Sequence, residues 1–236
     1  ALRAGLNDFP AKSLVVLHAC CHNPTGVDLD AGQWDEVVRV VKERQLVPFI
    51  DFAYQGFGDG IAEDAAALRA FTASGMPFVV ASSFSKSFSL YRERVGALTL
   101  VTSSADEAKR VTSQLKRVIR TNYSNPASHG GQIVALVLAD PELRRQGEGE
   151  LAEMRERIQR MRGLFVEKLA SKGVKRDFSF IARQKGMFSY SGIELDRVRR
   201  LRQEFGLYIV DSGRICVAAM NEKNLDYITD AIAAVL

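Results

Sequence analysis

The chain has 236 residues, of which 32 are basic and 28 acidic, and its formal net charge of +4 is spread without a long run of one sign. Hydrophobic residues make up 47% and charged residues 25%, which is typical of a globular protein with one large core or two smaller ones. The weak positive charge suits small anionic substrates and argues against a nucleic-acid-binding protein. The apolar runs are too short to cross a bilayer, and the first residues lack a signal-peptide pattern, so we expect no membrane partner.

The first part of the chain alternates apolar runs with amphipathic segments. We expect strands over residues 14–19, 46–50, 78–81 and 95–101, and helices over residues 30–44, 62–73, 105–120 and 127–138. The first strand is continuously apolar, which predicts burial on both faces. Asp30 and Gln33 have the spacing of a capping pair. Strands that alternate with helices predict a mainly parallel sheet, with ligands at the carboxyl ends of its strands.

The pattern changes near Pro141. Apolar residues recur at helical spacing up to residue 172, but Gly147 and Gly149 weaken the first turns, so we expect the strong helix to begin near Glu150. Beyond it, short strands are expected over 187–190, 207–210 and 215–218, and helices over 194–204 and 222–235. We therefore predict two domains, residues 1–150 and 151–236, joined by a long helix.

The cysteines are Cys20, Cys21 and Cys216. Their spacing is neither that of a zinc site nor that of a secreted disulfide framework. We expect reduced thiols in a cytoplasmic protein. The histidines do not form a cluster either, so we predict no metal site.

Lys86 follows the predicted strand at 78–81 and stands among serines. A lysine at a strand end is easily desolvated, which makes its amine available as a nucleophile. Serine hydroxyls and a guanidinium are good phosphate ligands. The segment offers the hydroxyls of Ser83 and Ser85 and the guanidinium of Arg94. The segment therefore predicts a Schiff-base lysine beside a phosphate site.

Two upstream segments fit the same ligand. Asp51 directly follows the predicted strand at 46–50, and its carboxylate would keep a pyridine nitrogen protonated. The hydroxyl of Tyr54 and the amide of Asn23 would donate to a phenolate oxygen. Together with Lys86, these groups meet the needs of pyridoxal 5′-phosphate, PLP, so the residues predict a PLP-dependent enzyme.

These residues stand in motifs that resemble those of the aspartate and aromatic-amino-acid aminotransferases, of PLP fold type I. The motifs are His22-Asn23-Pro24-Thr25-Gly26, Asp51-x-x-Tyr54-Gln55-Gly56-Phe57, Ser83-x-x-Lys86 with Arg94, Arg120-Thr121-Asn122-Tyr123-Ser124-Asn125-Pro126, and Ser212-Gly213-Arg214. The resemblance runs over nearly the whole chain, which matches the carboxyl-terminal portion of such an enzyme. It implies an α/β fold: residues 1–150 are the carboxyl-terminal part of a large PLP-binding domain with an incomplete, mainly parallel sheet, and residues 151–236 are a smaller α/β domain.

The resemblance also implies roles for matching positions. Lys86 would bind PLP covalently and then move a proton between substrate and cofactor. Arg214 would clamp the substrate α-carboxylate, and Phe188 would line the side-chain pocket. Arg120 would reach across the interface of a homodimer to the distal carboxylate of a dicarboxylic substrate. The implied reaction is ping-pong transamination between an amino acid and a 2-oxo acid.

Among the substrates of the family, we expect aromatic amino acids, and also aspartate, to donate to 2-oxoglutarate, because residues 85–91 are closer to the aromatic branch. One alternative is an aspartate aminotransferase proper. A PLP-dependent lyase or decarboxylase is another, although Arg214 implies that the α-carboxylate is retained. An inactive fragment, or a non-catalytic subunit that lacks the amino-terminal half, is the alternative of another class.

Two other motif matches fail. Gly56-x-Gly58-x-Gly60 has Ile61 where a dinucleotide loop needs its third glycine. The Ser83-x-x-Lys86 string matches penicillin-recognising enzymes, but their Ser-Asp-Asn and Lys-Thr-Gly strings are missing from the sequence.

Overall fold

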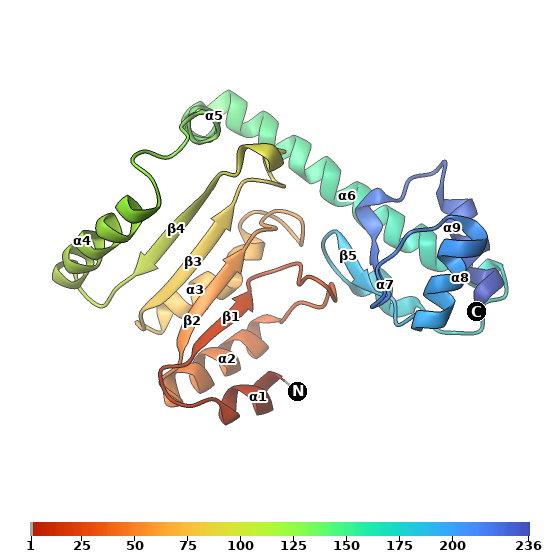
Figure 1. Ribbon diagram of the computed structural model, residues 1–236, viewed down its shortest axis with the longest axis horizontal. Coiled ribbons are helices and arrows are strands. Elements are labelled where there is room, and N and C mark those ends of the chain that lie inside the picture. The colour runs from red at the N-terminus through yellow and green to blue at the C-terminus, as the bar shows by residue number, and fades with distance from the viewer. Residues whose placement is uncertain (1) are drawn as a thin grey trace. The chain divides into compact units, whose positions relative to one another are not determined.

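The computed structural model describes residues 2–236, which divide into two compact units (Figure 1). The first unit contains the residues up to Ala19, Leu29–Gln55 and Ile61–Gly149. The second contains Cys20–Asp28, Gly56–Gly60 and Glu150–Leu236. Two short loops from the first part of the sequence therefore belong to the second unit.

The first unit is built on a four-stranded sheet in the order β1-β2-β3-β4. Its strands are β1 (Leu14–His18), β2 (Val47–Phe52), β3 (Phe78–Ser83) and β4 (Gly96–Val101). The first three strands run parallel, and β4 pairs antiparallel with β3. The expected α/β fold with a mainly parallel sheet is confirmed. The helices of this part are α1 (Leu2–Asp8), α2 (Ala31–Glu43), η1 (Glu63–Ala65), α3 (Ala66–Ala73), η2 (Tyr91–Glu93), α4 (Ala105–Asn122), α5 (His129–Ala139) and the start of α6 (Pro141–Ser171).

The core of the first unit forms where α2 and α3 meet the sheet. The expected capping pair is present: Asp30 accepts the Gln33 N–H at 2.8 Å, and the Gln33 side chain accepts the Asp30 N–H at 3.0 Å. Trp34 of α2 packs edge-on against Phe71 of α3, with ring centroids 6.4 Å apart. Phe71 lies 5.6 Å from Phe78 of β3, so the three rings join both helices to the sheet.

The opposite face of the sheet is open in residues 2–236. Along β1, Val15 and Leu17 are buried, whereas Leu14 and Val16 are 59% and 58% exposed. The prediction that this strand is buried on both faces is therefore wrong for the chain by itself. The strand register places Leu14 beside Val47, so we use the name open face for the side of the sheet that carries Leu14 and Val16.

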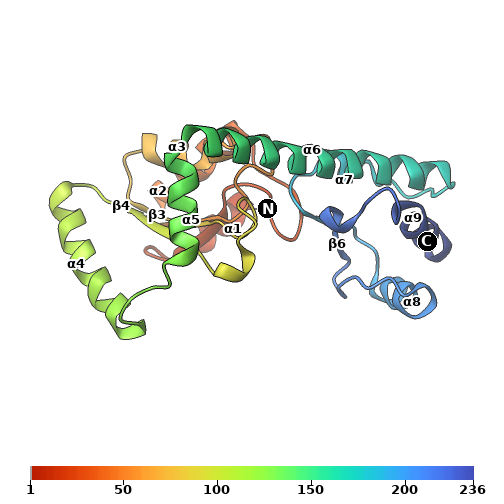
Figure 2. The ribbon, with the colours of Figure 1, turned by 90° about the horizontal axis from the view of Figure 1, so that it is seen from above.

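Helix α4 also presents its apolar side chains to solvent. None of its residues is buried, and Val118 and Ile119 are exposed. Figure 2 shows the helix standing clear of the sheet. It begins with a regular cap, because the Ser104 hydroxyl accepts the Glu107 N–H at 3.2 Å.

The second unit combines helices with a two-stranded antiparallel sheet. Its elements are the rest of α6, α7 (Ser179–Arg183), β5 (Phe188–Tyr190), α8 (Leu195–Phe205), β6 (Arg214–Cys216), η3 (Val217–Ala219) and α9 (Leu225–Val235). Residues 207–210 are irregular rather than a strand, and residues 217–219 form a 3-10 turn. Among the helices of the described chain, none combines the length and the apolarity that a bilayer-spanning segment needs.

Helix α6 begins earlier than the sequence predicts. It starts at Pro141, and one carboxylate oxygen of Asp140 accepts the N–H groups of Glu142 and Leu143 at 2.8 and 3.0 Å. Proline suits the first position of a helix, and the Asp140 cap satisfies the free donors. This start outweighs the cost of Gly147 and Gly149, so the helix runs through both glycines.

Replacing Phe71 should destabilise the first unit strongly. Phe71→Ala removes a ring that has no exposed surface, and such deletions cost about 3–5 kcal/mol of unfolding free energy. Trp34, the only tryptophan, reports unfolding by its fluorescence in a urea titration. Thr72→Ala, at an exposed site on the same helix, should shift the transition by less than about 0.5 kcal/mol. Equal shifts for the two variants would contradict the packing described above.

Candidate functional site

Asp51 lies near the carboxyl end of the central parallel strand. It is the penultimate residue of β2, and its register partners are His18 of β1 and Ala81 of β3. Residues paired in register point to the same side of a sheet, so the Asp51 carboxylate belongs to the open face. A ligand placed at this end of the open face would meet a negative charge from the strand below it.

Lys86 lies in a tight turn directly after β3. The turn is closed by the N–H of Phe88 donating to the carbonyl of Phe84 at 3.3 Å, and the two rings pack edge-on 5.3 Å apart. The Lys86 amine lies 4.8 Å from the ring centroid of Tyr54 and 5.7 Å from that of Tyr91. Tyr54 is buried, so the amine is held over an aromatic surface at the strand ends.

The three residues predicted to bind phosphate come from neighbouring strand ends. Ser83 is the last residue of β3, and its hydroxyl accepts the N–H of the buried Ser85 at 3.2 Å. Because β4 runs antiparallel, its first residue, Gly96, pairs with Ser83. Arg94 stands just before it, exposed and with a left-handed φ of 54°, and donates to the Tyr91 carbonyl at 2.9 Å.

A second group of predicted residues gathers in the second unit. One Arg214 guanidinium N–H donates to the Asn23 side-chain oxygen at 2.9 Å. The guanidinium carbon lies 4.5 Å from the centroid of the Phe188 ring. We call Asn23, Phe188 and Arg214 the arginine cluster. In the part of the chain that the structure describes, no carboxylate forms an ion pair with Arg214, so its planar donor fork is available to an anionic ligand.

Arg120 stands apart from both groups. It is exposed near the carboxyl end of α4, where its guanidinium donates to the Ser124 hydroxyl at 2.5 Å. The structure therefore brings Asp51, Tyr54, Ser83, Ser85 and Lys86 to one end of the first sheet, with Arg94 two residues before the adjoining strand β4. It brings Asn23, Phe188 and Arg214 into one cluster of the second unit, and it leaves Arg120 at the surface.

Sequence reasoning missed the residues that hold the loops in place. Arg155 and Gln159 of α6 donate to the carbonyls of Gly56 and Gly58, at 3.0 and 3.1 Å. Arg162 of the same helix is buried and has five acceptors. The signal was available for Arg162, because it stands on the apolar stripe of a predicted helix.

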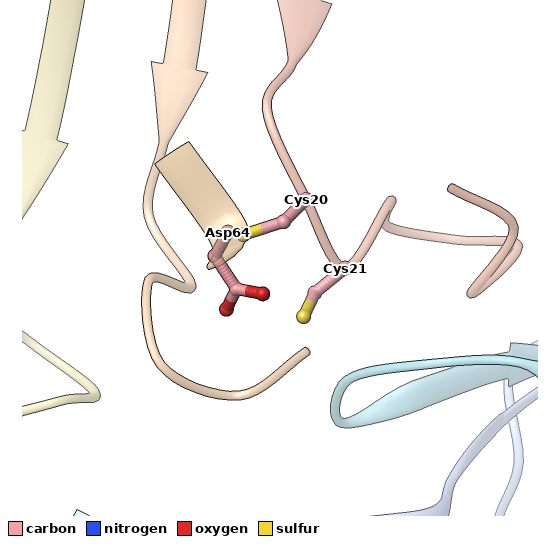
Figure 3. A group of neighbouring side chains, drawn as sticks. All are labelled: Cys20, Cys21 and Asp64. Carbon is pink, nitrogen blue, oxygen red and sulfur yellow. The ribbon is translucent and has the colours of Figure 1, made fainter. Parts of the chain in front are cut away.

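Cys20 and Cys21 come after β1 and Ala19, and Figure 3 shows them on the loop that leaves this strand. The third residue labelled there, Asp64, stands on η1. Both cysteines are buried, and neither forms a disulfide bond within residues 2–236. Cys21 has a φ of 52°, and its backbone N–H donates to the Asp28 carboxylate at 2.7 Å. These contacts fix the start of the loop that carries Asn23.

The two groups of residues have complementary chemical capacities. The first supplies a primary amine, a carboxylate, a phenol and two serine hydroxyls, which suit a ligand with an electrophilic carbon, a basic ring nitrogen and an anionic group. The second supplies a guanidinium flanked by an aromatic ring, which suits a carboxylate attached to an apolar body. The residues present therefore fit a phosphorylated aldehyde cofactor and a carboxylate-bearing substrate.

Comparison with known proteins agrees with this chemistry. The family model described as aminotransferase class I and II matches residues 1–232. The chain is 63% identical to an aspartate aminotransferase of Pseudomonas aeruginosa, over 99% of this chain and 60% of the relative. It is 49% identical to an aromatic-amino-acid aminotransferase of Escherichia coli, over all of this chain and 59% of the relative.

A solved structure is also closely similar. An aromatic-amino-acid aminotransferase from Burkholderia pseudomallei, covalently bound to pyridoxal phosphate, superposes with a TM-score of 0.97 at 64% identity. The match covers 99% of this chain and 58% of that one. The chain therefore has the fold of the corresponding part of these enzymes, and it spans about 60% of the length of its relatives.

Gly96 should be sensitive to substitution because it lies against the end of β3. A Cβ at this position would meet the Ser82 carbonyl oxygen at 2.5 Å, so Gly96→Ala must push the two strands apart. We expect a loss of about 1–3 kcal/mol of unfolding free energy, measured by chemical denaturation. Gly131→Ala is the matched control, since nothing lies within 4 Å of its Cβ and alanine favours a helix. A stable Gly96→Ala variant would contradict the close pairing.

Proposed function

Because the chain belongs to the class I and II aminotransferase family, we propose that the complete protein transfers an amino group between an amino acid and a 2-oxo acid, with PLP as its cofactor. The observation that carries the proposal is the position of Lys86. Its amine lies over the Tyr54 ring, in the turn at the end of the sheet where Asp51 belongs to the open face. An amine, a carboxylate and a phenol at one sheet edge are the groups that PLP chemistry requires.

In this proposal the residues of the first unit would hold the cofactor and move a proton. Lys86 would bind the cofactor covalently, and its amine would later carry a proton to and from the substrate α-carbon. Asp51 would keep the ring nitrogen protonated, and the Tyr54 hydroxyl would donate to the phenolate oxygen. Ser83, Ser85 and Arg94 would bind the phosphate. When bound, PLP supplies an electron sink for the bond that breaks at the α-carbon.

The arginine cluster would bind the substrate. Arg214 would hold the α-carboxylate through paired hydrogen bonds, because a guanidinium matches a carboxylate in shape and charge. Asn23 supports this task, since its oxygen accepts one Arg214 N–H and leaves its NH2 to donate to the phenolate oxygen. The Phe188 ring fixes the guanidinium from its face and would line the side-chain pocket. Retention of the carboxylate by Arg214 favours transamination over decarboxylation.

We propose aromatic amino acids and aspartate as the amino donors and 2-oxoglutarate as the acceptor. The relatives carry both kinds of name at similar identity, which supports a site that accepts both. Residues 1–150 would be the carboxyl-terminal part of the large domain, and residues 151–236 the small domain. The exposed Arg120 and the apolar side chains of α4 fit a homodimer, in which Arg120 reads the distal carboxylate across the interface. Cysteines that form no disulfide bond in the described part of the chain fit a cytoplasmic location.

Lys86 should carry the cofactor in the complete protein. After incubation with PLP, borohydride reduction and peptide mapping, we expect a pyridoxyl group on Lys86 in the wild type and none in Lys86→Ala. Turnover should fall at least about 10³-fold in that variant, because the covalent link and the proton carrier are lost together. Lys109→Ala, at an exposed site of α4, should behave as wild type. Labelling at another lysine would disprove the assignment.

Arg120 should matter for dicarboxylic substrates alone. Arg120→Ala should raise the barrier for aspartate and 2-oxoglutarate by about 2–5 kcal/mol, as when a paired charge loses its partner, and leave phenylalanine nearly unaffected. Steady-state kcat/KM for each substrate measures this. Arg117→Ala, one turn earlier on the exposed helix, is the control. Equal losses for both substrate classes would make Arg120 a structural residue, and an overwhelming preference of the wild type for aspartate would favour an aspartate aminotransferase proper.

A further inference from the structure

Among the residues whose burial the structure describes, Arg162 is the largest side chain with almost no exposed surface, at 1%. It stands on α6 between the buried Ile158 and Phe165, on the stripe that faces the core of the second unit. Its two terminal nitrogens donate to the Ser189 hydroxyl at 2.5 Å and to four backbone carbonyls at 2.6–3.2 Å. Those carbonyls belong to Ile181, Lys185, Gly186 and Phe188.

The charge of Arg162 is balanced by carbonyl dipoles. Burial lowers the pKa of its guanidinium to about 10, so the group stays positively charged at neutral pH. Within residues 2–236 no carboxylate forms an ion pair with it, and its Nε–H is buried without a partner. A buried charge is costly unless its surroundings are arranged around it, so residues 185–189 are held in the one shape that points their carbonyls at the fork.

The segment that Arg162 organises carries the aromatic ring of the arginine cluster. Phe188 gives its carbonyl to Arg162, while its ring lies 4.5 Å from the Arg214 guanidinium carbon. The neighbouring Ser189 gives its hydroxyl to Arg162 and pairs with Ile215, the residue after Arg214. The Arg162 guanidinium therefore holds the Phe188 carbonyl and the Ser189 hydroxyl of β5, while the Phe188 ring contacts the Arg214 guanidinium.

The loop that carries Asn23 rests on the same segment. The Lys185 N–H donates to the Gly26 carbonyl at 2.8 Å. Gly26 has a φ of 70°, and a Cβ there would meet the Phe188 carbonyl oxygen at 2.7 Å. Gly186 fits as closely, since a Cβ would meet that of Cys21 at 2.4 Å. Any movement of residues 185–188 would therefore move Asn23 as well as Phe188.

We propose that Arg162 is a positioning residue for the carboxylate site: by fixing residues 185–189, it sets where Phe188 and Asn23 meet Arg214. The inference rests on the proposed function, because it takes Arg214 as the ligand of the substrate carboxylate. Arg162 itself touches no substrate. Its effect on binding passes through backbone carbonyls, so a side chain with the same charge but a different donor geometry should not replace it.

The test compares Arg162→Lys with the wild type in the complete protein. Lysine keeps the charge but has all its donors on one nitrogen. It therefore cannot reach the carbonyls that bind the two separate terminal nitrogens of arginine. Succinate is the probe, since any enzyme that uses 2-oxoglutarate must bind a dicarboxylate. We expect its Kd and the KM for amino acids to rise by about 10- to 100-fold, the range that a small misplacement produces, with a smaller change in kcat.

A second readout does not depend on activity. Hydrogen exchange of residues 184–190 should accelerate in Arg162→Lys, because the Lys185 N–H loses its fixed position on Gly26. Arg197→Lys is the matched control: Arg197 also donates to a backbone carbonyl, that of Leu236 at 2.7 Å, but lies away from the segment. It should leave exchange at residues 184–190 and succinate binding unchanged.

A folded Arg162→Lys protein with wild-type exchange and wild-type succinate affinity would overturn the proposal. If that variant does not fold, Ser189→Ala takes its place, since it removes only one acceptor and keeps Arg162. It should weaken succinate binding about 2- to 5-fold, as for one lost hydrogen bond, and an unchanged affinity would overturn the proposal equally. A wild type that binds no succinate would contradict the proposed function, and the exchange result would still decide whether Arg162 fixes the segment.

Discussion

Parallel strands end at a common edge, and the chemistry of the first unit depends on that constraint. Because β1, β2 and β3 run in the same direction, the Asp51 side chain and the turn that carries Lys86 arrive at one end of the sheet. The antiparallel β4 then starts where β3 ends, which places Arg94 near Ser83. One reversal of strand direction therefore adds a cationic residue to an edge that already offers an amine, a carboxylate and hydroxyls.

In the second unit the arginine cluster is held largely by loops and short strands, so its position depends on how the carbonyls of those segments are bonded. Short strands and loops have few ladder hydrogen bonds to hold them, and their carbonyls need partners when buried. Arg162 supplies those partners for residues 185–189, and Arg155 with Gln159 does so for residues 56–60. Helix α6 thus acts as a rigid row of donors, and loops distant in sequence take their shape from it.

The sequence predicted most elements of the fold, and its failures have physical causes. The capping box of α2 was readable because both partners lie within three residues, whereas the cap of α6 was masked by two glycines that propensity counts as helix breakers. The prediction that β1 is buried on both faces was wrong because the sequence of a strand shows that it is apolar but does not show whether another element covers it. The motifs placed Lys86 and Arg214 in a family context. The position of Arg162 on the apolar stripe of a helix indicated its burial, but the carbonyls that Arg155 and Arg162 contact could not be read from a residue pattern.

Substrate choice separates into a general and a specific part. In the proposed function, Arg214 would bind the carboxylate that every amino acid carries. Its guanidinium donates to the Asn23 side-chain oxygen and lies over the Phe188 ring. These contacts are the same for aspartate and for an aromatic amino acid, so they set affinity for the class and give no preference within it. In the proposed function, preference between the two substrate classes would then come from groups that meet the substrate side chain, such as Arg120 for a second carboxylate. A site with both Arg120 and apolar surface would accept dicarboxylic and aromatic amino acids, and Arg214 would bind the α-carboxylate of each.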